Sequence, residues 1–528
     1  MLQSIILASI ILIAVYVLKR QRESKLNLAP LVPYNIPILG HTLSYMINCK
    51  NFIRQCREDY GDMFCLYLFG RIVTIVGKEH SHEVLSKDDV FDFTEEFRRR
   101  VPGEVMFANI NGFGDPVYNV KIVKEFITKK LNLYNDRIQK TFYSATQKYI
   151  GGSDDKRTIY NLYIVMTKIV SFPISNILIG EEESIYDEVI TTFSEFTTDI
   201  SIFIAIPPFL DFIYPGLHYY MNRVVVRLGL FDPAKKHRDV LTRHVKYQVD
   251  KRLREKQIYG DSWNRPDDLL QNFMEEPFFN PKNIDYEALA NRLSIFIFAA
   301  VHTTARVMAN AIIDLASRPE YMQGLYEEQL EIRKKADENG ILPIESLNEM
   351  IKLDSFLRES LRTIDDIVAL PHYVLKDYTF SNGYQVQKGQ LADLDLSDTH
   401  DDEQMQGENP ESFDAYRHID KNFPASKITK NFVSFGGGKH ACPGRYLAVN
   451  GIKYFLHNLI INYNFRTESG KVEEKLRYGP LTMPSNNGII FEKSVGIIFD
   501  GLSFLSLCEG QRQTRLTFLF MSQEGRSD

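Results

Sequence analysis

The chain has little of several residue types that mark common protein classes. Its 528 residues include one tryptophan and five cysteines, and 62 basic residues against 68 acidic ones give a net charge of −6. This balance gives no reason to expect nucleic-acid binding. The five cysteines follow no disulfide-framework spacing, which suits a reducing compartment. No Asn-x-Ser/Thr acceptor, internal repeat or low-complexity block occurs, so nothing points to a secreted or repetitive architecture.

One cysteine near the C-terminus lies in a glycine-lined loop before an apolar helix. Residues 435–444 read FGGGKHACPG. Glycines let a backbone approach a flat macrocycle where side chains would collide. Backbone N–H groups keep a sulfur ionised, and because Pro443 has none, Gly444 and Arg445 are the expected donors. This context suits Cys442 as a thiolate ligand of heme iron.

Other interpretations of the loop fit less well. A lone cysteine in a cytosolic domain is more often an inert buried thiol. A phosphate-binding loop needs Gly-Lys-Ser/Thr, but Lys439 is followed by His440. A zinc site needs a second cysteine or a cluster of histidines nearby, and the loop offers neither. The choice between a heme ligand and an inert thiol therefore depends on a second motif.

The loop resembles the heme-binding signature of the cytochrome P-450 family, Phe-x-x-Gly-x-(Arg/His)-x-Cys-x-Gly. Its fixed positions are filled by Phe435, Gly438, His440, Cys442 and Gly444, with Gly436 as an additional loop glycine. The resemblance implies heme b (iron protoporphyrin) with Cys442 as its axial ligand.

The second motif lies upstream, where residues 353–362 read LDSFLRESLR and residues 410–417 read PESFDAYR. Glu359 and Arg362 share one helix face, which by itself describes an ordinary surface ion pair. The resemblance implies more, namely that Glu359, Arg362 and Arg417 form a buried structural triad behind the heme loop. Linked charges of this kind satisfy groups that burial would otherwise penalise.

The apolar segment from about Tyr286 to Ser317 predicts a buried helix. Its centre contains the polar group His302-Thr303-Thr304. The resemblance implies that this turn crosses the heme face opposite the cysteine, where Thr303 hydrogen-bonds dioxygen and helps deliver protons. From the residues alone an alternative stays open, in which Thr303 bonds its own backbone four residues earlier.

This segment departs from the family pattern Ala/Gly-Gly-x-Asp/Glu-Thr-Thr, because Ala300 replaces the glycine and His302 replaces the acid. Histidine shuttles protons near neutral pH, so His302 is a candidate catalytic residue. The alternative is a neutral His302 that is hydrogen-bonded within the core. The variant resembles a fungal subset that includes ent-kaurene oxidase and indole-diterpene oxidases, which implies a terpenoid or similarly hydrophobic substrate.

Two histidines, His440 and His372, stand where many family members carry an arginine that holds the heme propionates. Both can donate to a carboxylate, and a loop histidine facing water is the alternative for each. No Trp-x-x-x-Arg occurs on the early helix, where Lys121 or Lys124 is the candidate replacement. By the same resemblance, the substrate pocket uses the loop 97–114, Phe298, Ala299, Ile367, Val368, Leu481 and Thr482.

Residues 2–18 form an almost unbroken apolar run that Lys19 and Arg20 follow, and no basic residue precedes it. About 17 residues is the short end of membrane-spanning length. The positive-inside rule places the N-terminus in the lumen and the catalytic domain in the cytosol. A cleaved signal peptide would need basic residues first. We therefore expect a single-pass anchor (1–18) in the endoplasmic reticulum membrane, followed by a basic, proline-rich hinge (19–40).

The remaining pattern predicts a mainly helical chain with small β-sheets, the cytochrome P-450 fold, over residues 41–493. Hairpins are expected at residues 65–76 and 378–390, and a helix from Pro443 to about Asn462. Residues 494–528 have no counterpart in the family. An extra helix, a disordered tail and an artefact of gene prediction all stay open for them.

The resemblance implies a monooxygenase that oxidises a hydrophobic small molecule of secondary metabolism with dioxygen. Its expected partners are NADPH–cytochrome P-450 reductase, cytochrome b5 as a second candidate donor, and membrane lipid. Two alternatives stay open: a heme-thiolate isomerase or dehydratase, and a heme-binding protein with little turnover.

Overall fold

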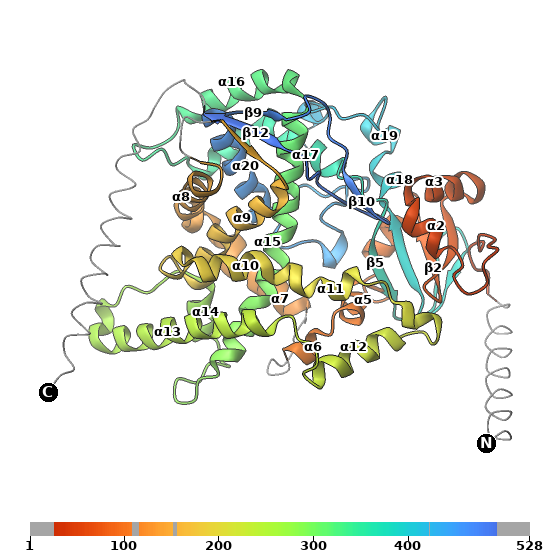
Figure 1. Ribbon diagram of the computed structural model, residues 1–528, viewed down its shortest axis with the longest axis horizontal. Helices are drawn as coiled ribbons and strands as arrows, with labels where there is room; N and C mark the ends of the chain where they lie inside the picture. Colours follow the sequence, from red (N-terminus) through yellow and green to blue (C-terminus); the bar gives the residue numbers. More distant parts are fainter. Residues whose placement is uncertain (1–25, 108–115, 152–155, 422, 494–528) are drawn as a thin grey trace.

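The computed structural model describes residues 26–107, 116–151, 156–421 and 423–493 (Figure 1). The expected anchor (1–18) and tail (494–528) lie outside these ranges. The described chain is mainly helical with small sheets, as the sequence predicted. Its helices are α2 (Thr42–Ile47), α3 (Cys49–Tyr60), α4 (Ser81–Ser86), α5 (Phe93–Arg100), α6 (Gly103–Met106), α7 (Pro116–Ile122), α8 (Leu131–Tyr149), α9 (Leu162–Ile179), α10 (Asp187–Ile200), α11 (Ile202–Ala205), α12 (Leu217–Arg227), α13 (Lys235–Tyr259), α14 (Leu269–Glu275), α15 (Tyr286–Ala316), α16 (Met322–Arg333), α17 (Ile351–Arg362), α18 (Leu396–His400), α19 (Glu403–Gln406) and α20 (Arg445–Asn462).

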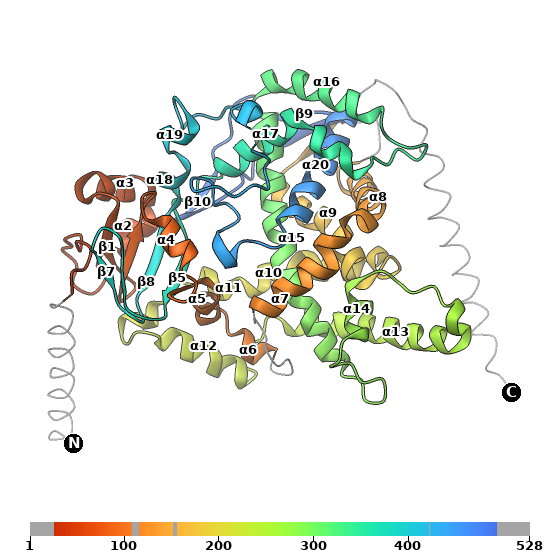
Figure 2. The ribbon, with the colours of Figure 1, turned by 180° about the vertical axis from the view of Figure 1, so that it is seen from behind.

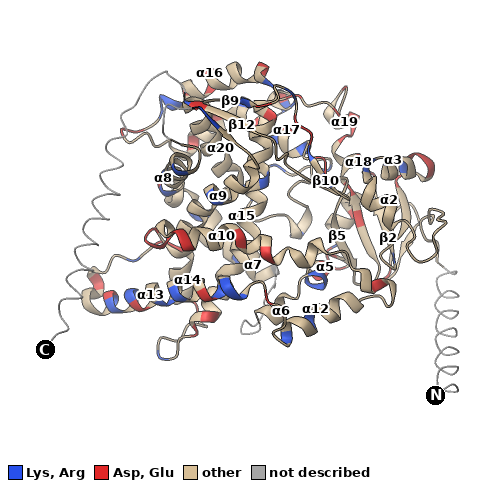
Figure 3. Cartoon of the chain, in the orientation of Figure 1, with Lys and Arg blue, Asp and Glu red and all other residues tan. Residues whose placement is uncertain are grey.

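Helix α15 runs through the middle of the molecule (Figures 1 and 2). The side chain of Asp285 caps its start by accepting a hydrogen bond from the N–H of Ala288, 2.8 Å away. Helices α9, α10, α13 and α17 pack around it, and most of its residues are buried. The helix predicted from Tyr286 to Ser317 is thus confirmed. Figure 3 shows that α9 and α15 carry few charged side chains, whereas α13 carries many.

Within the described residues, three stretches are long and apolar enough to cross a membrane: Leu162–Ile179, Asp187–Phe212 and Tyr286–Ala316. At least half of each is buried inside the globule. Their apolar side chains belong to one continuous core that also includes α8, α17 and α20. We therefore assign these stretches to the hydrophobic core.

A five-stranded sheet with the order β1-β2-β8-β5-β3 lies at one end of the molecule beside α2 and α3 (Figure 1). The turn between its first two strands has positive φ at Phe69 (48°) and Gly70 (77°), the geometry that suits a two-residue hairpin. The two predicted hairpins and the helix after the cysteine loop are confirmed. The strands of this sheet are β1 (Met63–Leu68), β2 (Arg71–Val76), β3 (Phe91–Asp92), β5 (Val368–Val374) and β8 (Leu391–Asp395).

The smaller sheets cover other parts of the helical body. They comprise β4 (Arg157–Ile159), β12 (Ile489–Lys493) and β9 (Tyr463–Thr467); β6 (Tyr378–Thr379) and β7 (Gln385–Val386); and β10 (Leu476–Tyr478) and β11 (Leu481–Met483). The described part of the proline-rich stretch is attached to the domain by hydrogen bonds to β1. Cys65 donates its N–H to the carbonyl of Pro30 (2.8 Å), and Val32 donates to the carbonyl of Cys65 (3.0 Å). This stretch therefore runs along β1.

A buried ionic cluster joins α17 to the segment that leads toward the cysteine loop. The Arg362 guanidinium donates to both oxygens of Glu359 at 2.7 and 2.9 Å, and the side chains of both residues are fully buried. Arg417 Nε donates to Glu359 Oε1 at 3.1 Å, and His418 Nε2 to Oε2 at 3.2 Å. Asp401 accepts from Arg362 at 2.8 Å. The segment from Asp401 to His418 is thereby fixed against α17.

We expect Arg362→Ala to lower the free energy of unfolding by about 3–5 kcal/mol, because it leaves Glu359 buried without its main partner. Urea unfolding followed by circular dichroism measures this change. Lys334→Ala is the matched control, since Lys334 and Glu331 form a pair with the same spacing but are 69% and 71% exposed. Equal effects of the two variants would contradict the account of the cluster.

The same cluster makes stability depend on pH. Burial opposes ionisation of Glu359, but hydrogen bonds from Arg362 and His418 outweigh it and lower the pKa of Glu359 from 4.5 to about 2. The stabilisation is therefore complete above about pH 4.5 and is lost as the pH falls toward 2. In Glu359→Gln this part of the pH dependence should disappear.

Candidate active site

The loop before α20 holds Cys442 with backbone rather than with side chains. Gly436 and Gly438 have φ of 69° and 56°, which only glycine adopts easily. A Cβ at Gly438 would collide with the carbonyl of Leu85 in α4, so the loop approaches that helix closely. The N–H of Cys442 donates to the carbonyl of Phe435 at 2.8 Å and closes the loop.

The sulfur of Cys442 receives two backbone hydrogen bonds. The N–H groups of Gly444 and Arg445 point at it, and these are the donors that the sequence predicted. Burial raises the pKa of the Cys442 thiol, while the two N–H groups and the Arg445 charge act in the opposite direction. Such an environment suits a metal cation that replaces the proton of the Cys442 thiol.

Helix α15 presents one exposed turn inside an otherwise buried stretch. Ala299 and Thr303 are four residues apart and therefore share a face, and both are exposed. Val301 and Ala305 next to them are fully buried. Open space therefore lies beside this turn within the molecule. The Thr303 hydroxyl donates to the carbonyl of Ala299 at 2.7 Å, the backbone bond named above as the alternative role of Thr303.

Other residues expected to line a pocket divide into two groups. Phe298 and Phe97 are half-buried, with ring centroids 5.5 Å apart, and Leu481 is exposed. Ile367, Val368 and Thr482 are buried. Residues 108–114 of the expected loop lie outside the described residues.

The ring of His302 points away from this exposed turn. Its Nδ1 lies 2.5 Å from the Tyr163 hydroxyl of α9, and its Nε2 lies 2.8 Å from the carbonyl of Ser194 in α10. Burial lowers the pKa of His302, so the ring is neutral. This geometry favours the hydrogen-bonded core histidine over the proton shuttle.

His372 and His440 lie close to each other, with ring centroids 6.4 Å apart. A bulge in β5 and a positive φ of 52° at Leu370 turn His372 inward. Its Nδ1–H donates to the carbonyl of Leu370 at 2.6 Å, and burial is the main cause that lowers the pKa of His372 to about 4. The Nε2 of His440 is buried and has no hydrogen-bond partner among the described residues.

Two further features of this region were not predictable from the sequence. Arg99 of α5 lies over the ring of Tyr373, the residue after His372, with its guanidinium 3.9 Å from the ring centroid. A guanidinium is a common partner of a carboxylate. In the sequence, however, three consecutive arginines at the end of a helix indicate only a solvent-exposed helix end. Lys124 lies in a π-helical turn, Val123–Ile127. Just after this turn, the Thr128 hydroxyl donates to the carbonyl of Pro443 at 3.3 Å.

These residues fit a heme. A half-buried sulfur with two N–H donors provides an axial ligand, and glycines rather than side chains border the loop. The exposed turn of α15 provides an apolar face with a single hydroxyl. His372 and His440 provide polar groups for carboxylates, and the unpartnered Nε2 of His440 is the clearest sign of a missing acceptor.

Comparison with known proteins finds cytochrome P450 relatives of this chain. Cytochrome P450 monooxygenase 151 of Postia placenta is 24% identical over 502 residues, which cover 91% of this chain and 97% of that protein. Cytochrome P450 monooxygenase paxQ of Penicillium paxilli is 32% identical over 184 residues, or 33% of this chain and 35% of that protein. The solved structure of retinoic acid-bound cyanobacterial CYP120A1 shares the fold, with a TM-score of 0.64 at 19% identity over 89% of this chain and 100% of that chain.

The family comparison covers nearly all of the described chain. The cytochrome P450 family profile matches residues 30–491, from the proline-rich stretch along β1 to the last strand β12. Together with the cysteine loop and the exposed turn of α15, this match places the chain in the cytochrome P450 family of heme-thiolate monooxygenases.

Proposed function

We propose that this monooxygenase binds its heme through Cys442 and oxidises a terpenoid or similarly hydrophobic small molecule beside the exposed turn of α15. The proposal rests on the sulfur of Cys442, which lies in a glycine-rich loop and accepts hydrogen bonds from two backbone N–H groups. Bound there, a heme-thiolate group supplies the activation of dioxygen and the oxidation of the substrate.

The protein side chains have separate tasks in this proposal. The N–H groups of Gly444 and Arg445 limit the electron donation of the sulfur. His372 and His440 hold the heme carboxylates. The Thr303 hydroxyl, which donates to the Ala299 carbonyl, would turn toward the open space beside it and hold a proton there. Phe97 and Phe298 keep water away from that turn.

The substrate class rests on the composition of the site and on relatives. The side chains bordering the exposed turn are apolar apart from Thr303, and a hydrophobic molecule fits such a lining. The sequence Ala299-Ala300-x-His302-Thr303-Thr304 resembles that of fungal terpenoid oxidases.

We further propose that the protein is a single-pass protein of the endoplasmic reticulum membrane, with its catalytic domain in the cytosol. The apolar run at residues 2–18 supports this. So does an apolar surface on the described chain, where large side chains are exposed without a partner. It comprises Ile38, Leu43 and Ile47 at one end, and Phe209, Ile213, Leu228 and Leu230 around α12.

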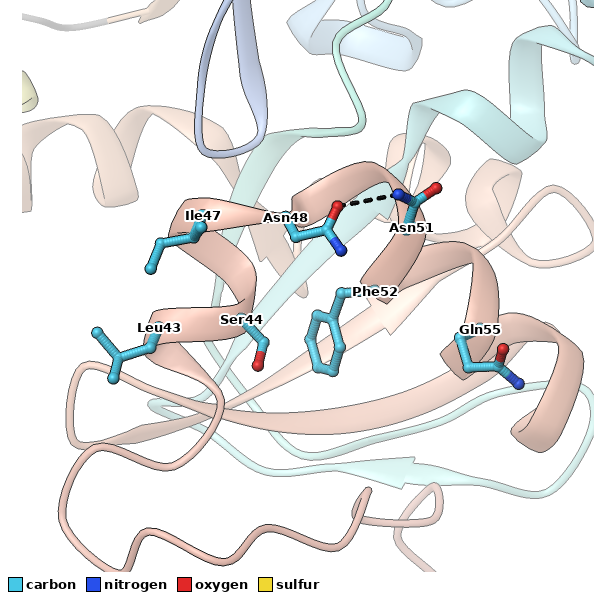
Figure 4. Close-up of a pocket in the computed structure, with 7 residues that line it drawn as sticks. All are labelled: Leu43, Ser44, Ile47, Asn48, Asn51, Phe52 and Gln55. Carbon is cyan, nitrogen blue, oxygen red and sulfur yellow. Dashed lines mark hydrogen bonds between the residues drawn. The ribbon is translucent and has the colours of Figure 1, made fainter.

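The two parts of this surface are linked. Arg71 at the turn of the β1–β2 hairpin forms an ion pair with Asp211, beside Phe209 and Ile213. Between α2 and α3 the surface has a hollow of about 480 Å³, where Leu43, Ile47 and Phe52 lie beside a hydrogen-bonded Asn48–Asn51 pair (Figure 4). A mixed apolar and amide lining of this kind suits the interfacial zone of a bilayer.

Electrons would arrive from NADPH–cytochrome P-450 reductase, with cytochrome b5 as a second candidate donor. Exposed lysines near the cysteine loop support docking of an acidic partner. Lys439 lies within the loop, is 80% exposed and pairs with Asp88. Lys129, next to the Thr128 that bonds Pro443, is 66% exposed and pairs with Glu125, so an acidic partner would compete for both lysines.

We expect Cys442→Ser to abolish the Soret band at ~450 nm that the reduced, carbon monoxide-treated protein shows with thiolate ligation. Difference spectra of the purified protein measure this. Cys56→Ser is the control, because Cys56 is buried in α3, away from the site, and should leave the band intact. A normal band in Cys442→Ser would refute Cys442 as the ligand.

We expect reductase-reconstituted membranes to turn over terpenes in preference to fatty acids when a panel of both is supplied. With the best substrate, Thr303→Ala should reduce product per NADPH by ~10-fold or more, because the proton donor is lost. Product and NADPH are quantified in the same sample. Unchanged coupling in Thr303→Ala would remove Thr303 from proton delivery, and fatty acids as the only substrates would remove the terpenoid assignment.

In sealed microsomes, we expect added protease to digest the catalytic domain and to leave an N-terminal tag protected in the lumen. Alkaline carbonate should not extract the protein. A domain that is digested only after detergent treatment would contradict the proposed orientation.

A further inference from the structure

The residue that replaces the family acid, His302, bridges three helices instead of facing Thr303. Tyr163 stands near the start of α9, Ser194 lies in α10, and His302 lies at the centre of α15. The side chain of His302 is buried, and both ring nitrogens have partners at 2.5 and 2.8 Å. Within the described chain, the hydrogen-bond partners of this ring include no acidic side chain.

The partners determine the protonation state of the ring. The Ser194 carbonyl can only accept, so His302 Nε2 carries the hydrogen and donates it. Nδ1 is then an acceptor, and the Tyr163 hydroxyl donates to it. Burial raises the pKa of Tyr163 to about 12, so this hydroxyl keeps its hydrogen. Burial also lowers the pKa of His302, which keeps the ring neutral.

This arrangement has no route for a proton to Thr303. Passing a proton from Tyr163 to Nδ1 would send the Nε2 hydrogen to a backbone carbonyl, which cannot hold it. The arrangement does have a mechanical consequence. One side chain joins α15 to the two helices that cover it, at the residue next to Thr303.

A second connection holds the other side of the same turn. Arg306 makes two hydrogen bonds to Asp366 at 2.6 and 3.0 Å and also donates to the carbonyl of Thr482. Asp366 precedes Ile367 and β5, and Thr482 lies in β11. Thr303 therefore lies between two attachments of α15. One leads to α9 and α10, and the other leads to the start of β5 and to β11.

We propose that His302 is a positioning residue, which together with Tyr163 ties α15 to α9 and α10 and thereby fixes the turn that carries Thr303. This inference rests on the proposed role of Thr303 in the monooxygenase site. When the tie is broken, α10 and α15 would separate more often and water would reach the turn. Two electrons from NADPH and two protons from water would then reduce dioxygen to hydrogen peroxide instead of being used to oxidise a substrate.

The test compares variants of the full-length, heme-loaded protein in vesicles with reductase and NADPH, without added substrate. Gln in place of His302 offers an amide N–H to Ser194 and an amide oxygen to Tyr163, yet relays no proton. Leu offers neither. Tyr163→Phe removes only the hydrogen bond to Nδ1, and so reports on the tie if His302→Leu fails to fold. Thr198→Val is the control, because its hydroxyl is 3.4 Å from Nε2, whose hydrogen is already directed at Ser194.

A lost hydrogen bond shifts a local opening equilibrium by roughly two- to tenfold. We expect His302→Leu to release about five- to tenfold more peroxide per NADPH than the wild type. Tyr163→Phe should release roughly two- to fivefold more, and His302→Gln and Thr198→Val should stay within about twofold. Amide hydrogen exchange in α10 and the centre of α15 should rise in the same order.

Two results would overturn the proposal. If His302→Gln releases as much peroxide as His302→Leu while hydrogen exchange is unchanged, His302 acts on protons and not on position. If neither Tyr163→Phe nor His302→Leu changes exchange or peroxide, the tie has no role. If the wild type shows no ~450 nm band, the proposed heme site is refuted instead. Hydrogen exchange would still test whether His302 and Tyr163 hold α15 to α9 and α10.

Discussion

The sulfur of Cys442 can accept two backbone hydrogen bonds only in a loop where no side chain intervenes, and much of the surrounding structure serves that requirement. Gly436 and Gly438 take left-handed backbone conformations, and Gly438 has no room for a Cβ against Leu85. Helix α20 begins at Arg445 and supplies one of the two N–H groups. The buried cluster of Glu359 and Arg362 fixes the preceding segment against α17. The loop thus lies between two rigid attachments.

The opposite wall of the site depends on how α15 is held. Its length and apolar surface bury it among other helices, and only Ala299 and Thr303 keep an exposed turn beside the site. The ion pair of Arg306 and Asp366 attaches this turn to the pocket wall. On the other side the neutral pair of Tyr163 and His302 takes the place of the acidic side chain common in the family. A charge-free attachment avoids the cost of burying a carboxylate among apolar helices.

Local features of the sequence predicted the elements that depend on local chemistry. Helix α15 and helix α20 follow from long apolar segments, and the β1–β2 hairpin follows from two β-rich runs around Gly70. The donors to Cys442 follow from the missing N–H of Pro443. Contacts between distant segments were not predictable in the same way. The partners of His302 precede it by 139 and 108 residues, and β2 pairs in parallel with β8 more than 300 residues later. The contact of Arg99 with Tyr373 was not predictable either, because only the fold brings these two residues together.

The most direct test of the account is X-ray absorption at the iron edge of the purified protein. If Cys442 is the axial ligand, the spectrum of the wild type contains one sulfur scatterer together with the porphyrin nitrogens, and Cys442→Ser loses the sulfur contribution. An iron with only nitrogen and oxygen neighbours in the wild type, or a sulfur contribution that survives the substitution, would contradict the central claim.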